Sequence, residues 1–278
     1  MSGLFFWRRR PQGEKMFWDE KEMVRQEVRA RDIGIIFRGC PQKVFKNALE
    51  LGGGDGFQSR FLQLYACSLT VTDRDQKVMN DPLPGIQYRI MDLHDMSRIF
   101  PPAAFDLIFS SNVLEHVPRI ASGLAQMERV LQPGGLMIHV LPTGFWKFLQ
   151  YLLFGPVKFR NMLKLFLCRE IKKQTKSREE FPIQKSFEFF PASHGGQVSS
   201  LAEFYYFSRR YWQSLFEKSG FEILSVKKLQ FHSPYHLGLP FSIRSFFSRA
   251  GFSSAQAYIM KREHETSPYE KYFGVSHE

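Results

Sequence analysis

Glycine and carboxylate residues between positions 50 and 56 have the types and spacing to bind a positively charged ligand. Glu50 is followed at alternate positions by Gly52, Gly54 and Gly56, and Asp55 lies between the last two. Glycine reaches φ > 0 without strain and has no Cβ, so a ligand can approach the backbone N–H groups. The two carboxylates would repel a pyrophosphate and favour a ligand with a cationic end. A plain structural turn is the alternative interpretation.

The spacing excludes two common nucleotide motifs. A dinucleotide-binding G-x-G-x-x-G would need glycine at position 57, which is Phe, and a P-loop would need a lysine directly after Gly56. The apolar stretch 44–51 before the glycines predicts a buried strand, and 57–67 predicts a helix. Strand, glycine turn and helix together form a geometry that brings a nucleotide-like ligand against the backbone.

Further strands are expected to end in polar residues. The stretch 69–73 predicts a second strand whose last residue, Asp73, follows Gly52 by 21 positions. An acid about 20 residues after the glycine turn commonly accepts hydrogen bonds from ribose hydroxyls. The alternative is an exposed aspartate at a strand end. Strands are also predicted at 87–91, just before Asp92, and at 105–110, which runs into N-V-L-E-H-V at 112–117.

The order of these stretches resembles the class I S-adenosylmethionine (SAM) methyltransferases. E-L-G-G-G-D-G at 50–56 resembles their E-x-G-x-G-x-G motif, 112–117 resembles the N-x-L-E-H-V segment of the type 11 branch, and L-Q-P-G-G at 131–135 resembles a turn frequent in the family. The resemblance implies an α/β fold with a Rossmann-like sheet of seven strands, the last one antiparallel, and SAM as cofactor. It also implies that Asp92 meets the adenine amino group and that an apolar neighbour packs on the ring. The expected cofactor-binding residues are Glu50, Gly52, Gly54, Gly56, Asp73, Asp92, Leu93, Asn112 and His116.

The resemblance also divides the chain into segments. Residues 41–141 and 207–262 are expected to form the SAM-binding core, with the sixth and seventh strands at 221–229 and 256–261. Residues 1–40 are expected to supply an arm and a helix at 14–32 that covers the cofactor, and 263–278 a tail. Residues 142–206 interrupt the family pattern and predict a helical lid over the acceptor site, broken at Pro156.

The lid segment is apolar and basic. Between 143 and 190 it has ten Lys or Arg against four Glu, an excess of six out of the formal net charge of +11. Apolar residues interleaved with Lys and Arg are typical of helices on an anionic membrane surface, and the aromatic and basic residues 1–13 could add an anchor. A second apolar insertion at 231–251 could join the same surface. A plain lid packed on the core, and a disordered chain start, are the alternatives, and nucleic-acid binding is disfavoured because no RNA-binding signature appears.

The bulk composition points to a cytoplasmic protein that could be peripheral on the inner face of the membrane. The 278 residues include 29 Phe, which favours a large apolar site or a membrane-facing surface. The three cysteines are far apart and form no C-x-x-C, as expected in a reducing compartment. No stretch reaches the roughly 18 uninterrupted apolar residues that a membrane-spanning helix needs.

Histidine residues are the candidates for proton transfer. His194 lies before two glycines and could accept a proton from an acceptor hydroxyl as the catalytic base, although a histidine on a surface loop is an equal alternative. His116 and His139 are weaker candidates, and His139 is expected inside a strand. No metal is implied, because no His, Asp and Glu cluster shows ligand spacing along the sequence.

The expected activity is SAM-dependent O-methylation of an apolar or membrane-borne acceptor, such as a lipid, a quinone-like compound or a lipid-linked glycan. Two alternatives remain open at this point. One is a soluble methyltransferase for small molecules whose insertion is only a lid. The other is a SAM-binding regulatory protein without turnover.

Overall fold

The described part of the chain covers nearly all of the predicted core. The computed structural model describes residues 20–54, 56–75, 82–174, 191, 193–194, 199–232 and 240–274, and only the backbone of residues 20–25 and 161–174. The predicted arm at 1–13, Asp55, and parts of both apolar insertions lie outside the described residues.

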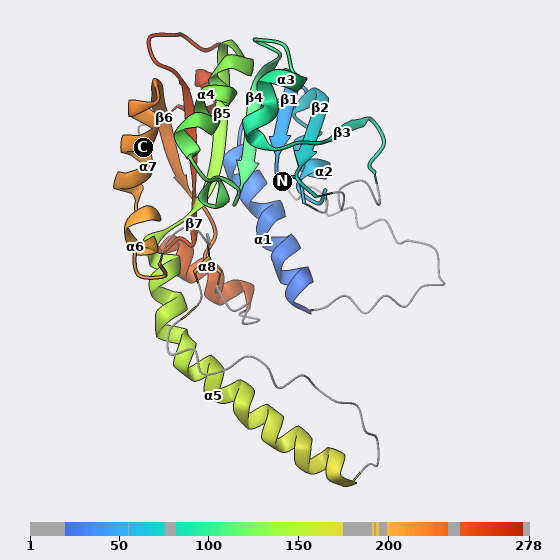
Figure 1. The fold of residues 1–278 in the computed structure, drawn as a ribbon, viewed down its shortest axis with the longest axis vertical. Helices are drawn as coiled ribbons and strands as arrows, with labels where there is room; N and C mark the ends of the chain where they lie inside the picture. Colours follow the sequence, from blue (N-terminus) through green and yellow to red (C-terminus); the bar gives the residue numbers. More distant parts are fainter. Residues whose placement is uncertain are drawn as a thin grey trace.

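A seven-stranded sheet forms the centre of the fold (Figure 1). The strand order is β3-β2-β1-β4-β5-β7-β6; neighbours among β1 to β5 pair in parallel, and β7 lies antiparallel between β5 and β6. The expected fold class is therefore confirmed, including the antiparallel last strand. The strands are β1 Phe45–Leu51, β2 Ala66–Asp73, β3 Ile86–Ile90, β4 Phe105–Ser111, β5 Leu131–Pro142, β6 Phe221–Lys228 and β7 Ala255–Arg262.

Helices cover both faces of the sheet. Successive strand residues point to opposite faces, so Ala48 packs in the cluster that includes α1, α2 and α9, whereas Leu49 packs in the cluster with α3, α4 and α7. Burial on both faces explains the long apolar runs in the sequences of the central strands β4 and β5. The helices are α1 Glu20–Ile36, α2 Ser59–Leu62, α3 Met96–Ile99, α4 Ile120–Val130, α5 Gly144–Gln174, α6 Glu203–Tyr206, α7 Arg209–Lys218, α8 Phe241–Arg249 and α9 Glu270–Phe273, with 3₁₀ turns η2 Leu93–Asp95 and η3 Leu114–His116.

Two predicted helices have different bounds in the structure. The helix expected at 57–67 has only the four residues of α2, because Ala66 already pairs with Phe45 as the start of β2. Tertiary strand pairing thus overrides the helical pattern of the sequence. The helix expected at 14–32 is found as α1, whose described part Glu20–Ile36 ends later than expected; residues 14–19 lie outside the described residues. The family-like turn at 131–135 forms the start of β5, directly after α4 stops at Val130.

The lid helix is continuous where a break was expected. Pro156 lies inside α5, which runs for 31 residues and extends away from the sheet (Figure 1). A proline removes one backbone N–H from the helix and frees the carbonyl of the residue four positions earlier, here Leu152. Leu152, Gly155 and Pro156 belong to the described residues and are all exposed, so water can reach the freed carbonyl.

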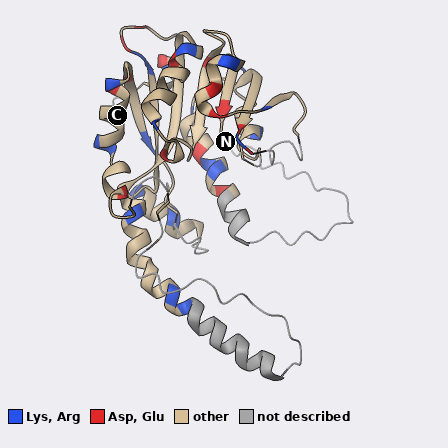
Figure 2. Cartoon of the chain, in the orientation of Figure 1, with Lys and Arg blue, Asp and Glu red and all other residues tan. Residues whose placement is uncertain are grey.

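Charge is sparse on the described part of α5. The charged residues on the part whose side chains are described are Lys147, which is buried near its start, and Lys158 and Arg160 near its end; most of the stretch between them is tan in Figure 2. Among the described helices, none combines the length and the apolar character that crossing a membrane requires.

Asp106 joins three segments of the core. Its buried carboxylate accepts hydrogen bonds from the backbone N–H groups of Lys46 at 2.7 Å and Asn47 at 2.9 Å, and from the Tyr269 hydroxyl at 2.8 Å. This side chain therefore connects β4 to the start of β1 and to the segment before α9.

Replacing Asp106 should destabilise the fold more than replacing its partner Tyr269. Asp106→Ala leaves two backbone N–H groups without their acceptor, so we expect the free energy of unfolding to fall by about 3 kcal/mol. Tyr269→Phe removes one hydrogen bond and should cost about 1 kcal/mol. Urea denaturation measures both, and equal losses for the two variants would contradict this role of Asp106.

Candidate functional site

A cavity of about 250 Å³ lies at the carboxyl ends of the parallel strands. Its walls come from the ends of β1 and β2 and from the residues just after β3 and β4, and this crevice is the usual ligand site of open α/β sheets. The volume is slightly below the roughly 300–1,000 Å³ of typical ligand pockets. Six of the nine predicted cofactor-binding residues line it: Gly52, Asp73, Asp92, Leu93, Asn112 and His116.

The glycine turn after β1 is held by β2. Gly52, Gly54 and Gly56 have φ of +67°, +58° and +72°, a region that side chains with a Cβ rarely adopt. The backbone N–H groups of Gly52 and Gly53 donate to the Thr72 carbonyl at 2.7 Å and 3.1 Å. A Cβ on Gly52 would lie 2.3 Å from Cγ2 of Val113, and one on Gly53 would lie 2.2 Å from Cγ1 of Val71. The turn thus needs glycine for close packing as well as for its backbone conformation.

Gly53 is a residue that the sequence reasoning passed over. It occupies a variable position of the alternating motif, so nothing in the spacing assigned it a function. Its requirement for glycine arises from contact with β2, which the sequence does not display. Gly54 and Gly56 do not line the cavity, and their role as cofactor contacts stays a prediction.

Asp73 connects the end of β2 to the glycine turn. One carboxylate oxygen accepts a hydrogen bond from the Gly54 N–H at 2.8 Å, and the other accepts one from the Asp75 N–H at 3.0 Å. A carboxylate oxygen has lone pairs for more than one donor, so Asp73 can receive ligand hydroxyl groups as well. Its position in the cavity wall is compatible with the predicted ribose contact.

Glu50 lies behind the turn and is almost fully buried. Its carboxylate accepts a hydrogen bond of 2.5 Å from the Ser59 hydroxyl of α2, and it is not among the cavity-lining residues. In this geometry Glu50 fixes the start of α2 against β1. A direct contact of Glu50 with the cofactor stays a prediction.

Asp92 lies where the chain leaves β3 and has protein partners on both oxygens. It accepts hydrogen bonds from the backbone and ring of His94 at 3.0 Å and 2.9 Å, and it pairs with Arg74 at 3.3 Å. The hydrogen bond from the His94 backbone is the main reason why the pKa of Asp92 is lowered. Asp92 therefore faces the cavity as a carboxylate, and Leu93 beside it supplies an apolar wall.

The segment after β4 brings a second group of polar and ionisable side chains to the cavity region. Asn112 adopts φ of +54°, and η3 follows with Glu115 and His116. Glu115 has a 1% exposed side chain, and burial raises the pKa of its carboxyl to about 8. Sequence reasoning did not single out Glu115, although it stands next to His116 in the family-like segment.

His194 packs at the start of α5, next to this segment. Its side chain is 33% exposed and meets the Trp146 ring edge-to-face at a centroid distance of 4.8 Å. Its Nε2 lies 3.9 Å from Oε1 of Glu115, and its ring lies 4.9 Å from that of His116. Burial lowers the pKa of His194 to about 4, so its imidazole is neutral at pH 7. His194 is therefore no isolated histidine on a surface loop, but a base function stays a prediction.

His139 is a core residue, as the sequence indicated. It is fully buried in β5, pairs with the Ser110 hydroxyl at 2.8 Å, and burial lowers its pKa to about 3.

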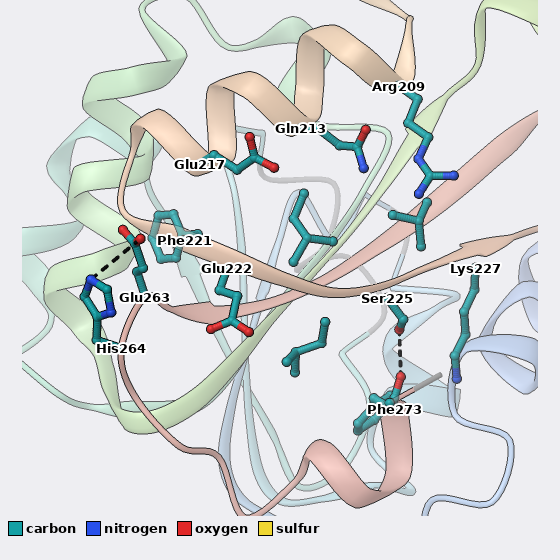
Figure 3. Close-up of a pocket in the computed structure, with 14 residues that line it drawn as sticks. Arg209, Gln213, Glu217, Phe221, Glu222, Ser225, Lys227, Glu263, His264 and Phe273 are labelled. Carbon is teal, nitrogen blue, oxygen red and sulfur yellow. Dashed lines mark hydrogen bonds and ion pairs between the residues drawn. The ribbon is translucent and has the colours of Figure 1, made fainter. Parts of the chain in front are cut away.

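A larger cavity of about 780 Å³ lies elsewhere, along the outer strand β6 (Figure 3). Arg209, Gln213 and Glu217 of α7 stand over one side of it, and Phe273 lies at the other end. None of the predicted site residues lines this cavity. It follows the length of an edge strand and not the carboxyl ends of the sheet, so we assign the functional site to the smaller cavity.

Comparisons with known proteins show what the central part of the chain is similar to. Residues 49–139 match the family model described as a methyltransferase domain, of the type 11 branch. A highly reducing polyketide synthase of Pyrenophora dematioidea is 34% identical over 70 residues, which are 24% of this chain and 3% of the synthase. The chain thus spans only a small part of that curated relative.

Two solved structures share the fold at low sequence identity. A methyltransferase of Haloferax volcanii, in complex with the Trm112 methyltransferase activator, has a TM-score of 0.52 and 11% identity, with 88% of this chain and 93% of that chain covered. A protein of Listeria monocytogenes described as an S-adenosylmethionine-dependent methyltransferase has a TM-score of 0.50 and 12% identity, with 86% and 99% covered.

Asp73→Asn should weaken SAM binding by about tenfold or more. The substitution removes the charge that strengthens hydrogen bonds to ribose hydroxyls but retains an acceptor oxygen for the Gly54 N–H. Isothermal titration calorimetry measures the affinity. Asp95→Asn is the control, because Asp95 pairs with Arg98 outside the cavity wall and its loss should leave the affinity unchanged. If Asp73→Asn bound SAM with wild-type affinity, this result would contradict the predicted ribose contact.

Proposed function

We propose that the chain is an S-adenosylmethionine-dependent methyltransferase and that it methylates a hydroxyl group of an apolar or membrane-borne acceptor. The match of residues 49–139 to a methyltransferase-domain family model supports this activity. The observation that carries this proposal is the exposed apolar surface of α5 and α8. Both helices extend from the end of the sheet where the parallel strands terminate and where the cofactor cavity lies (Figure 1).

The exposed side chains on these helices are large. Phe148, Leu152 and Phe159 of α5 are 50%, 57% and 63% exposed, and Phe246 of α8 is 65% exposed. Full burial of such a side chain is worth about 1.5–3 kcal/mol, so leaving several of them in water forfeits considerable stabilisation. Large exposed apolar patches on proteins commonly mark sites that bind partners, ligands or membranes. Lys158 and Arg160 on the same helix would favour an anionic surface.

The cofactor supports methyl transfer without a further reagent. The sulfonium of SAM carries an activated methyl group, so the protein mainly has to align acceptor oxygen, methyl carbon and sulfur. A hydroxyl acceptor also has to lose its proton. The cluster of Glu115, His116 and His194 lies where such an acceptor would approach, between the cavity and the start of α5.

Carbon methylation is the second candidate. The match to a stretch of a highly reducing polyketide synthase favours it, because polyketides are carbon chains. A soluble small-molecule acceptor, with α5 as a plain lid, and a regulatory protein without turnover are the remaining alternatives.

Incubation with SAM labelled by ¹³C at the methyl group identifies the acceptor. The protein, mixed with separate lipid and polar extracts, should transfer the label to the lipid fraction, and NMR of the product should show a methyl group on oxygen. A label on carbon would support the second candidate, and label in the polar fraction would support the soluble acceptor. Failure to label any fraction, despite SAM binding, would contradict enzymatic turnover on these acceptors.

Removing exposed aromatic side chains should weaken membrane binding. The double variant Phe159→Ser/Phe246→Ser loses two side chains that could insert into the interface, so we expect at least about tenfold weaker binding to anionic vesicles in a flotation assay. The control Leu64→Ser/Ile99→Ser alters side chains that are 45% and 38% exposed on other elements. If both double variants float equally well with anionic vesicles, the result would favour a plain lid. The same holds if the wild-type chain binds neutral and anionic vesicles equally well.

A further inference from the structure

Three potential metal ligands meet beside the cofactor cavity. Oε1 of Glu115 lies 3.9 Å from Nε2 of His116 and 3.9 Å from Nε2 of His194. One ligand atom from each of the three residues lies within 4.8 Å of the other two. Glu115 and His116 are neighbours on η3, whereas His194 comes from the segment after α5, so only the fold brings them together.

Glu115 has an unusual environment for a buried carboxyl group. Its side chain is 1% exposed, and within the described part of the chain neither carboxylate oxygen has a hydrogen-bond partner. Buried polar groups are nearly always hydrogen-bonded, and a buried group without a partner calls for a specific explanation such as an ion. Lys147 is also buried in this region, but its ammonium group pairs with Glu203 at 2.5 Å and with Gln150 at 2.7 Å.

We propose that Glu115, His116 and His194 bind one divalent transition-metal ion, with zinc as the best fit to the ligands. Two imidazoles and one carboxylate form a common set for catalytic zinc, which keeps a further position open for water or substrate. Tetrahedral ligands around zinc are about 3.4 Å apart when their bonds are about 2.0–2.1 Å long. The two observed separations of 3.9 Å are about 0.5 Å longer than this value, and the third pair of ligand atoms lies within 4.8 Å.

The surroundings of His194 hold its ring in place. Trp146 and Phe207 meet the imidazole edge-to-face at centroid distances of 4.8 Å and 6.1 Å. The preceding residue, Ser193, donates a hydrogen bond of 2.8 Å to Glu203, which in turn pairs with Lys147 of α5. Groups that fix the orientation of a ligand commonly contribute 10–100-fold to metal affinity. The start of α5 thus positions one of the three ligands.

The position of the ion suggests what it does, and this step rests on the proposed function. His116 also lines the cofactor cavity, so an acceptor hydroxyl in the open coordination position would lie next to the SAM site. A bound metal ion lowers the pKa of a coordinated hydroxyl group, whose proton leaves to water. The oxygen then forms its bond to the methyl carbon while the carbon–sulfur bond breaks, which yields a methyl ether and S-adenosylhomocysteine. His194 acts as a ligand in this scheme and not as a free base.

Direct metal titration tests the site without any acceptor. The full chain, freed of metal by a chelator, is titrated with Zn²⁺ by calorimetry and with Co²⁺ by visible absorption. We expect one ion per chain and displacement of Co²⁺ by Zn²⁺. Glu115→Gln and His194→Gln should each weaken the affinity at least about tenfold. His264→Gln is the control, because His264 has an 88% exposed side chain beside Glu263 and should not affect binding.

Two results would overturn the metal site. One is the absence of stoichiometric binding, and the other is wild-type affinity in both Glu115→Gln and His194→Gln. Unchanged SAM affinity in each variant verifies that the variant has folded. If Glu115→Gln does not fold, His194→Gln still tests the metal site, because it alters a partly exposed side chain. Full turnover of a chelator-treated enzyme would overturn only the activation step. Absence of methyl transfer to an apolar acceptor would overturn the proposed function and would leave the result of the metal titration unchanged.

Discussion

The connection between β1 and β2 at their carboxyl ends is the interaction on which the site depends. Two glycine N–H groups donate to the Thr72 carbonyl, and the Gly54 N–H donates to the carboxylate of Asp73. These bonds hold the turn open at the end of a parallel sheet and place an acidic side chain beside it. Because Val71 and Val113 pack directly against the turn, any side chain at Gly52 or Gly53 would displace it.

The parallel arrangement of β1 to β5 brings residues from separate sequence motifs together at one site. The residues that follow each strand are far apart along the chain, but the strand ends lie along the same edge of the sheet. The cavity predicted to hold the cofactor forms at the ends of β1 to β4, and α5 begins after β5 at the same edge. This cavity and the cluster around Glu115 are therefore neighbours by topology.

The sequence predicted the strands and six of the residues that line the cavity because these features are local. Alternating glycines, Asp73 at the expected distance and the segment at 112–117 each follow a strand directly. The role of Gly53 and the grouping of Glu115 with His194 arise from contacts between segments that lie far apart in the chain, which no spacing rule reveals. The short α2 and the continuous α5 also escaped prediction, since strand pairing and exposure of the helix decided those boundaries.

The central claim is that the SAM cofactor occupies the cavity at the glycine turn. A crystal structure with S-adenosylhomocysteine tests it most directly. We expect density for the ribose within hydrogen-bond distance of Asp73, with the sulfur near the segment that contains Asn112 and His116. Density in the larger cavity along β6, or an empty cavity at Gly52 in protein that binds the ligand, would contradict it.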